Sequence, residues 1–229
     1  MARKVGLPGA AGNWLWIAVA VSLGLSLTPW GPLVLYPFKV FTTWVHECGH
    51  ALMTVLVGGS VSSITIEPDT SGLTRSLIPS GRIARALVSS AGYLGATVVG
   101  CLLMAATRVE SRARAILWTI GTVMLVTLVI WIRNPFGFSA VLAWGVALIL
   151  LARRPAGNAV RFVLSLLAIQ VALNSVYDIR VLFGPHRGVS DADNMAGLFL
   201  LPSWIWAGAW MVISVGMLAG TLWGTRGRR

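Results

Sequence analysis

Two histidines and one glutamate stand within five residues in the segment TTWVHECGHALMTVLVGG, residues 42–59. His46 and His50 are four residues apart, so on a helix they project from one face and can reach a single metal ion. Glu47 then lies beside that ion without binding it, where its carboxylate can take a proton from water. The spacing H-E-x-x-H is therefore typical of a metal-dependent hydrolase, with His46 and His50 as metal ligands and Glu47 as the general base.

The surroundings of this motif favour the functional interpretation. The chain has only three histidines, and its Asp and Glu residues together number seven. Ionisable groups inside an apolar membrane helix are costly, and such a cluster indicates a functional site. The alternative is a buried pair of imidazoles whose hydrogen bonds are satisfied by neighbouring polar groups, without a metal.

A catalytic metal of this kind needs a third protein ligand and an open position for water. Asp178, in ALNSVYDIRVLF, lies near the end of an apolar run, and Asn174 precedes it by about one helical turn. We expect Asp178 to be the third ligand and Asn174 to hold either a substrate carbonyl or that ligand. The alternative for Asp178 is an ion pair with an arginine such as Arg180.

Three other residues remain open as the third ligand. Asp191 and Asp193, in SDADN, also suit a helix N-cap or a solvated turn, which is the interpretation we favour for them. His186, in FGPHRG, also suits an exposed loop.

The composition indicates an integral membrane protein. Of 229 residues, 56% are hydrophobic and 11% are charged, whereas soluble domains carry about 25% charged residues. The net charge of +11 comes mostly from basic residues in short clusters between apolar runs. That pattern is typical of loops that contact anionic lipid headgroups rather than of a nucleic-acid-binding face. We therefore expect a lipid bilayer as partner and no nucleic acid.

A bilayer requires about 20 apolar residues per helix. The runs that qualify are residues 13–36, 38–57, 83–107, 114–132, 135–152, 158–182 and 202–224. They predict an all-α polytopic membrane protein, a bundle of six to seven transmembrane helices that forms one domain over residues 1–229. We expect the first run to be an uncleaved span rather than a signal peptide. Sixteen arginines against two lysines favour a bacterial origin.

One segment does not follow the helical pattern. Gly58 and Gly59 interrupt the apolar run, and residues 61–66 are rich in β-branched side chains. Turn-forming residues follow at 67–72, which predicts a short β-hairpin after the motif helix. The alternative is a loop without fixed structure. Gly59 and Gly72 would let the backbone of a substrate approach closely, so we expect them to contribute to substrate binding.

The stretch HECGHALMTVLVGGSVSSITIEPDTSGLT, residues 46–74, resembles the site-2 protease family of intramembrane zinc metalloproteases, in particular its compact bacterial branch without a PDZ domain. SSAGYLGATVVG, RNPFG, SVYDI and SDADN are further, weaker points of similarity. The resemblance implies one Zn2+ at His46 and His50, Glu47 as the base, and a third ligand in a later helix that maps to Asp178. The chain departs from better-known members in having Ile179 after that aspartate where they have glycine.

The resemblance implies a zinc metalloendopeptidase that cleaves transmembrane protein substrates. A substrate helix hides its backbone in its own hydrogen bonds and must unwind before hydrolysis. The sequence shows no sensing domain, so a regulatory membrane partner or a second copy of the chain stays open as a further partner. Two alternatives from other functional classes also stay open: a metal-binding membrane regulator or degenerate protease without proteolytic activity, and a transporter with a polar intramembrane site.

Overall fold

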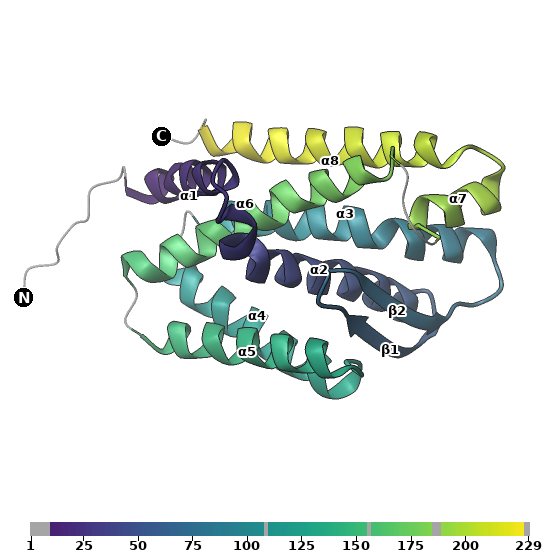
Figure 1. Ribbon diagram of the computed structural model, residues 1–229, viewed down its shortest axis with the longest axis horizontal. Coiled ribbons are helices and arrows are strands. Elements are labelled where there is room, and N and C mark those ends of the chain that lie inside the picture. Colours follow the sequence, from purple (N-terminus) through teal and green to yellow (C-terminus); the bar gives the residue numbers. More distant parts are fainter. Residues whose placement is uncertain (1–9, 108–109, 155–156, 185–188, 227–229) are drawn as a thin grey trace, which may run out of the picture.

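A computed structural model of the chain describes residues 10–107, 110–154, 157–184 and 189–226. Within these ranges the chain forms eight helices and a two-stranded hairpin (Figure 1). The helices are α1 (Ala10–Ser26), α2 (Gly31–Leu56), α3 (Arg82–Ala106), α4 (Glu110–Ile130), α5 (Pro135–Arg153), α6 (Asn158–Val181), α7 (Asp191–Phe199) and α8 (Ser203–Arg226). The strands β1 (Ser60–Ile66) and β2 (Gly72–Leu77) follow the motif helix α2. The predicted all-α fold with a short hairpin is confirmed.

Five of the described helices, α3, α4, α5, α6 and α8, are long and apolar enough to cross a membrane. Helix α1 contributes a shorter apolar stretch, Trp14–Ser26. Large apolar side chains such as Val129, Val212 and Trp223 are exposed on the outside of the bundle. In water this surface would be costly, whereas lipid covers it without penalty. The chain is therefore a multi-pass integral membrane protein.

The boundary between the first two helices differs from the predicted one. The apolar runs suggested a break at Pro37, but Pro37 lies inside α2. The chain instead turns at residues 27–30, where the N–H of Gly31 donates to the Thr28 carbonyl. Pro32 then falls in the first helical turn of α2, where a missing N–H costs nothing.

Because α2 starts at Gly31 rather than after Pro37, the motif lies further along its helix than the apolar run 38–57 predicted. Glu47 is sixteen residues after the start of α2, and Asp178 is twenty residues after the start of α6. At 1.5 Å per residue these positions are about 24 and 30 Å along their helices. Because α2 and α6 run in the same direction (Figure 1), both carboxylates reach the same end of the bundle.

Small residues let α2 and α3 cross closely. A Cβ on Gly49 would clash with the carbonyl oxygen of Ala91, and a Cβ on Gly92 would lie 2.5 Å from Nε2 of His46. Close approach through glycine is typical of helix pairs in membranes. Here it brings the backbone of α3 against the two motif histidines.

The hairpin is antiparallel, with Ile66 opposite Gly72 and Ile64 opposite Thr74. The side chains of Ile64 and Ile66 are fully buried, so this face of the hairpin packs on the bundle. Residues on alternate positions, such as Thr65, point to the opposite face. The sheet face that carries Gly72 and Thr74 therefore lies against α2.

The outer edge of β1 is covered by the segment that joins α4 to α5. Ile64 donates its N–H to the Trp131 carbonyl over 2.7 Å and accepts from the Arg133 N–H over 3.1 Å. The side-chain amide of Asn134 continues this pairing, because it accepts from the Ile66 N–H and donates to the Ile66 carbonyl. Among the described residues, β2 has no strand on its outer edge.

A second cluster of buried side chains fixes the short helix α7. Ala192 and Met195 of α7 pack in this cluster with residues of α3, α6 and α8. The other buried members are Tyr93, Ile179, Leu182, Ala207 and Trp210. This packing places the start of α7 beside the middle of α2, which determines the site described next.

Candidate metal centre

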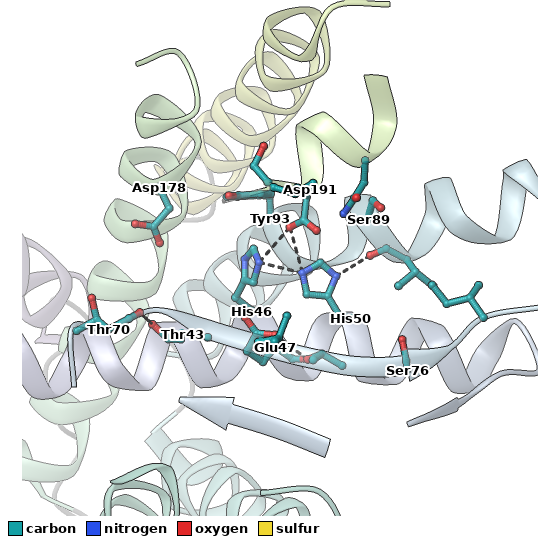
Figure 2. A pocket seen from close by; sticks show the side chains of 18 of the residues that line it. Thr43, His46, Glu47, His50, Thr70, Ser76, Ser89, Tyr93, Asp178 and Asp191 are labelled. Carbon is teal, nitrogen blue, oxygen red and sulfur yellow. Dashed lines mark hydrogen bonds and ion pairs between the residues drawn. The ribbon is translucent and has the colours of Figure 1, made fainter. Parts of the chain in front are cut away.

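Three donor atoms from two helices meet in one small cluster (Figure 2). His46 and His50 lie on one face of α2, and their Nε2 atoms are 3.0 Å apart. Asp191, the first residue of α7, places its Oδ2 3.2 Å from Nε2 of His50 and 3.4 Å from Nε2 of His46. The predicted convergence of the two imidazoles is thus accompanied by a carboxylate from a distant part of the chain.

The spacing of this cluster fits zinc. A tetrahedral zinc ion with bonds of about 2.0–2.2 Å to nitrogen and oxygen separates its ligand atoms by about 3.3 Å. The three separations among His46, His50 and Asp191 are 3.0, 3.2 and 3.4 Å. Two imidazoles and one carboxylate also form a donor set that zinc hydrolases use, with one position left for water. The residues present therefore suit the metal.

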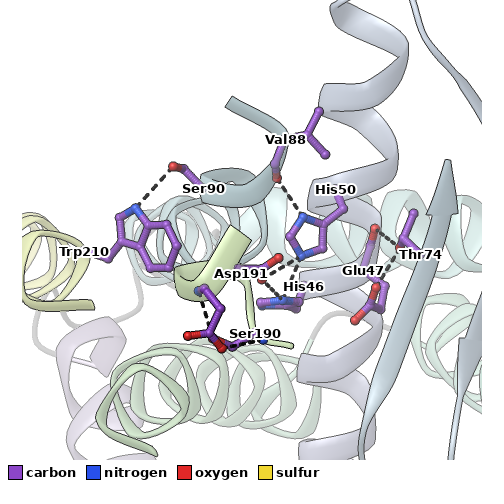
Figure 3. A network of polar contacts seen from close by, with 10 residues as sticks. His46, Glu47, His50, Thr74, Val88, Ser90, Ser190, Asp191 and Trp210 are labelled. Atoms are coloured by element: carbon purple, nitrogen blue, oxygen red, sulfur yellow. Dashed lines mark hydrogen bonds and ion pairs between the residues drawn. The ribbon is translucent and has the colours of Figure 1, made fainter. Parts of the chain in front are cut away.

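A main-chain contact from α3 orients His50. Its Nδ1 lies 2.7 Å from the carbonyl oxygen of Val88 (Figure 3). A carbonyl can only accept, so this Nδ1 carries the proton. In the neutral ring the lone pair of Nε2 then faces the cluster, which is the arrangement expected of a metal-binding histidine.

Aromatic packing holds His46. Its ring meets the ring of Tyr93 edge-on, with centroids 4.6 Å apart. Tyr93 in turn stacks on Trp210 of α8 at 5.3 Å, and the Trp210 indole N–H donates to the Ser90 hydroxyl over 3.2 Å. The position of His46 thus depends on three helices rather than on α2 alone.

A capping box positions Asp191 at the start of α7. The Ser190 hydroxyl accepts from the N–H of Asp193, and the Asp193 carboxylate accepts from the N–H of Ser190. Asp193 thus takes part in a helix cap as the third residue of α7, whereas the N-cap itself is Ser190. Burial raises the pKa of the Asp191 carboxyl, but the nearby imidazoles of His50 and His46 outweigh burial and hold that pKa below its usual range.

Glu47 lies next to the histidines but faces the hairpin. Its side chain is buried, and the Thr74 hydroxyl of β2 lies 2.7 Å from its Oε2 (Figure 3). A Cβ on Gly72 would come within 2.5 Å of its Oε1, so only glycine leaves room for this carboxylate. The base expected from the sequence is therefore enclosed between α2 and β2.

The residues around the cluster line a cavity of about 400 Å³. It lies between α2, α3, β2, the end of α6 and the start of α7. Besides the cluster itself, the lining residues are Lys39, Thr43, Glu47, Thr70, Gly72, Leu73, Thr74, Ser76, Ile78, Val88, Ser89, Tyr93, Asp178, Val189, Ser190 and Asn194.

The other expected site residues do not belong to the cluster of His46, His50 and Asp191. Asp178 lines the same cavity (Figure 2) but is not one of the residues whose donor atoms lie together within 4.8 Å. Asn174 does not line it, and its amide donates to the Thr42 hydroxyl over 3.4 Å. His186 lies outside the described residues.

The two glycines expected to contact substrate differ in position. Gly72 lines the cavity. Gly59 lies at the junction of α2 and β1, where its N–H donates to the Thr54 carbonyl over 2.8 Å. A Cβ on Gly59 would come 2.5 Å from the Leu77 carbonyl oxygen, so glycine is required there by packing between the helix and the hairpin.

The proximity of Asp191 to both histidines was not predicted from the sequence. The signal near Asp191 was the capping pattern Ser190-x-x-Asp193, which marks the first turn of a helix. The pattern does not reveal what that helix packs against.

Comparisons with known proteins support this picture at the level of the family. No curated protein and no solved structure shows a significant match to the chain. The sequence profile described as Peptidase M50B-like matches residues 14–221, which include the whole motif and the start of α7. The chain therefore belongs to the Peptidase M50B-like family, a site-2 protease-like family of membrane metallopeptidases.

Proposed function

We propose that the protein is a zinc metalloendopeptidase that hydrolyses peptide bonds within or near transmembrane segments of other proteins. The observation that carries this proposal is the group of three donor atoms at zinc-like separations, next to a buried glutamate, in a chain in which five of the described helices are long and apolar enough to cross a membrane. The arginine-rich composition supports a bacterial cell membrane as its location.

We assign His46, His50 and Asp191 as the ligands of one zinc ion. Asp191 is preferred to Asp178 because its carboxylate oxygen already lies within 3.4 Å of both imidazole Nε2 atoms. Asp178 makes no such contact, although it lines the same cavity.

In this proposal Glu47 is the general base. A zinc ion at the three ligands supplies Lewis-acid polarisation of the scissile carbonyl and lowers the pKa of a water molecule. Glu47 takes a proton from the attacking water and delivers it to the amide nitrogen that leaves, so the peptide gains one water and the base ends unchanged. The buried position of Glu47 and its contact with Thr74 keep the carboxylate at the cavity wall.

The hairpin supports a mode of substrate binding. Ile64 directs its N–H and carbonyl toward the segment 131–133, away from β2. In an antiparallel pair of strands, when one residue directs its N–H and C=O away from the residue opposite it, that residue does the same. Thr74 lies opposite Ile64, so it directs its own main-chain groups to the free edge of β2. We propose that an unwound segment of substrate adds to this edge as an extended strand, beside the cavity.

The test uses the full chain purified and reconstituted in liposomes, with quenched fluorescent transmembrane peptides that carry Gly, Pro or Asn near mid-span. Wild type is expected to bind one zinc per chain and to cleave the peptides. Glu47→Gln should keep the zinc and lose cleavage. Glu67→Gln is the matched control, because Glu67 is an exposed glutamate of the hairpin turn.

Two results would contradict the proposal. Cleavage by Glu47→Gln at the wild-type rate would remove Glu47 as the base. Stoichiometric zinc in wild type with no cleavage of any peptide would instead favour a metal-binding membrane protein without proteolytic activity.

A further inference from the structure

Thr74 connects the hairpin to the proposed base. Its hydroxyl lies 2.7 Å from Oε2 of Glu47 and 3.0 Å from the main-chain carbonyl oxygen of the same residue (Figure 3). Both groups are acceptors, a threonine hydroxyl has a single proton to donate, and the shorter of the two contacts is the one to the carboxylate. We infer that Thr74 is a positioning residue of this peptidase, which holds the Glu47 carboxylate against the strand that receives the substrate. The inference rests on the proposed function.

The Glu47 carboxylate depends on this one contact. Of the residues that the structure describes, none besides Thr74 donates a hydrogen bond to it. Its other oxygen faces Gly72, which offers no side chain. A hydrogen bond to an ionised carboxylate is short and strong, so it favours one orientation of that group. The Thr74 hydroxyl therefore determines where the base lies when it meets water.

The same residue faces the proposed substrate. The main-chain groups of Thr74 point to the free edge of β2, as its pairing with Ile64 requires. Its side chain points instead to Glu47 on α2. A substrate residue that pairs opposite Thr74 would therefore lie beside the residue that holds the base. Strand pairing and base orientation are set by a single residue.

The neighbouring hydroxyl on the same strand face has a different partner. Ser76, two residues after Thr74, accepts from the hydroxyl of Thr54 over 3.3 Å rather than contacting the base. Proximity to α2 alone therefore does not explain the contact of Thr74 with Glu47. The position of β2 along α2 therefore places the Thr74 hydroxyl, and not that of Ser76, at Glu47.

The experiment compares Thr74→Val, which keeps the shape but removes the hydroxyl, with Thr74→Ser, which keeps the hydroxyl. Thr65→Val is the matched control, because Thr65 lies on the opposite face of the hairpin. kcat and KM are measured in liposomes with the quenched transmembrane peptide that wild type cleaves best. Thr74→Val is expected to lower kcat about 10- to 100-fold, as for loss of a hydrogen bond to a charged group, with KM within about twofold.

Thr74→Ser and Thr65→Val are expected to stay within about threefold of wild-type kcat. An unchanged kcat in Thr74→Val would overturn the inference. So would an equal loss in Thr74→Ser, which would mean that the methyl group matters rather than the hydroxyl. Zinc content and thermal unfolding are measured for each variant, and Thr74→Ala replaces Thr74→Val if the latter does not fold.

A second measurement separates this inference from the proposed function. The infrared difference between wild type and Glu47→Gln isolates the carboxylate band of Glu47, whether or not the protein cleaves peptides. Thr74→Val should shift this band and Thr65→Val should not. Absence of cleavage by wild type would reject the proposed function alone, whereas an unshifted band in Thr74→Val would reject the positioning role alone.

Discussion

The Asp191 carboxylate lies 3.2 Å from Nε2 of His50, although the two residues belong to helices that meet only through tertiary packing. Each is fixed by a separate main-chain contact: the His50 ring by the Val88 carbonyl, and the start of α7 by the capping box of Ser190. The fold thus brings the donor atoms together through contacts that involve other residues of the protein.

Replacing each candidate aspartate tests which one is the third ligand. Asp191→Asn should weaken zinc binding by more than the roughly 10- to 100-fold typical of losing an outer contact. Asp178→Asn should leave the affinity within a few-fold of wild type, because the Asp178 carboxylate does not lie with the two imidazoles. Competition with a chromophoric chelator measures both. The reverse order of effects would make Asp178 the ligand.

The close contact between Gly92 of α3 and the two histidines of α2 leads to a second prediction. A methyl group on Gly92 would lie 2.5 Å from Nε2 of His46 and would also clash with the His50 ring. Gly92→Ala is therefore expected to abolish stoichiometric zinc binding and to lower the thermal unfolding temperature.

Gly95 provides the control for that change. It lies one turn further along α3, and a Cβ there would meet nothing closer than 3.6 Å, at the Cα of Gly49. Gly95→Ala should keep its zinc and its stability. Normal zinc content in Gly92→Ala would show that the imidazoles are not held against α3 as the structure has them.

The part of this site that could be predicted from the sequence is the local part. The spacing of His46, Glu47 and His50 follows from helix periodicity, and the hairpin follows from turn-forming residues between two β-prone stretches. Asp191 could not be ranked above Asp178 in this way. Its position depends on Ala192 and the rest of α7 packing against α3, α6 and α8, and no periodicity reports such packing.

The prediction of the first helix boundary was wrong for a similar reason. Pro37 is a strong local signal for a break, because proline removes an N–H from the helix. Helix α2 nevertheless continues through Pro37, and the Trp144 indole N–H donates to the Pro37 carbonyl over 3.0 Å. This bond shows that α5 packs against α2 at Pro37, whereas the carbonyl that loses its helical donor is that of Leu33, four residues earlier.

The hydrogen bonds between the Asn134 side chain and β1 lead to a third prediction. Asn134→Asp keeps an acceptor for the Ile66 N–H but puts a carboxylate oxygen opposite the Ile66 carbonyl, where the amide now donates over 2.6 Å. Repulsion there should loosen the hairpin, so hydrogen exchange over residues 60–77 should become faster. Peptide cleavage should fall because β2 is then less ordered as a template. Asn158→Asp, at the exposed start of α6, is the control and should change neither quantity.

Zinc is expected to join α7 to α2, which gives the last prediction. An ion that binds only the folded state raises the free energy of unfolding by about 2.7 kcal/mol at a concentration 100 times its Kd. In wild type, zinc should raise the unfolding temperature and slow hydrogen exchange in α7, because Asp191 would bridge that helix to His46 and His50. In Asp191→Asn the protection of α7 should disappear while exchange in α4 and α5, which lie outside the site, is unchanged in both proteins. Equal protection of α7 by zinc in Asp191→Asn would mean that the ion is held without α7, and the third ligand would then have to come from another element of the cavity wall.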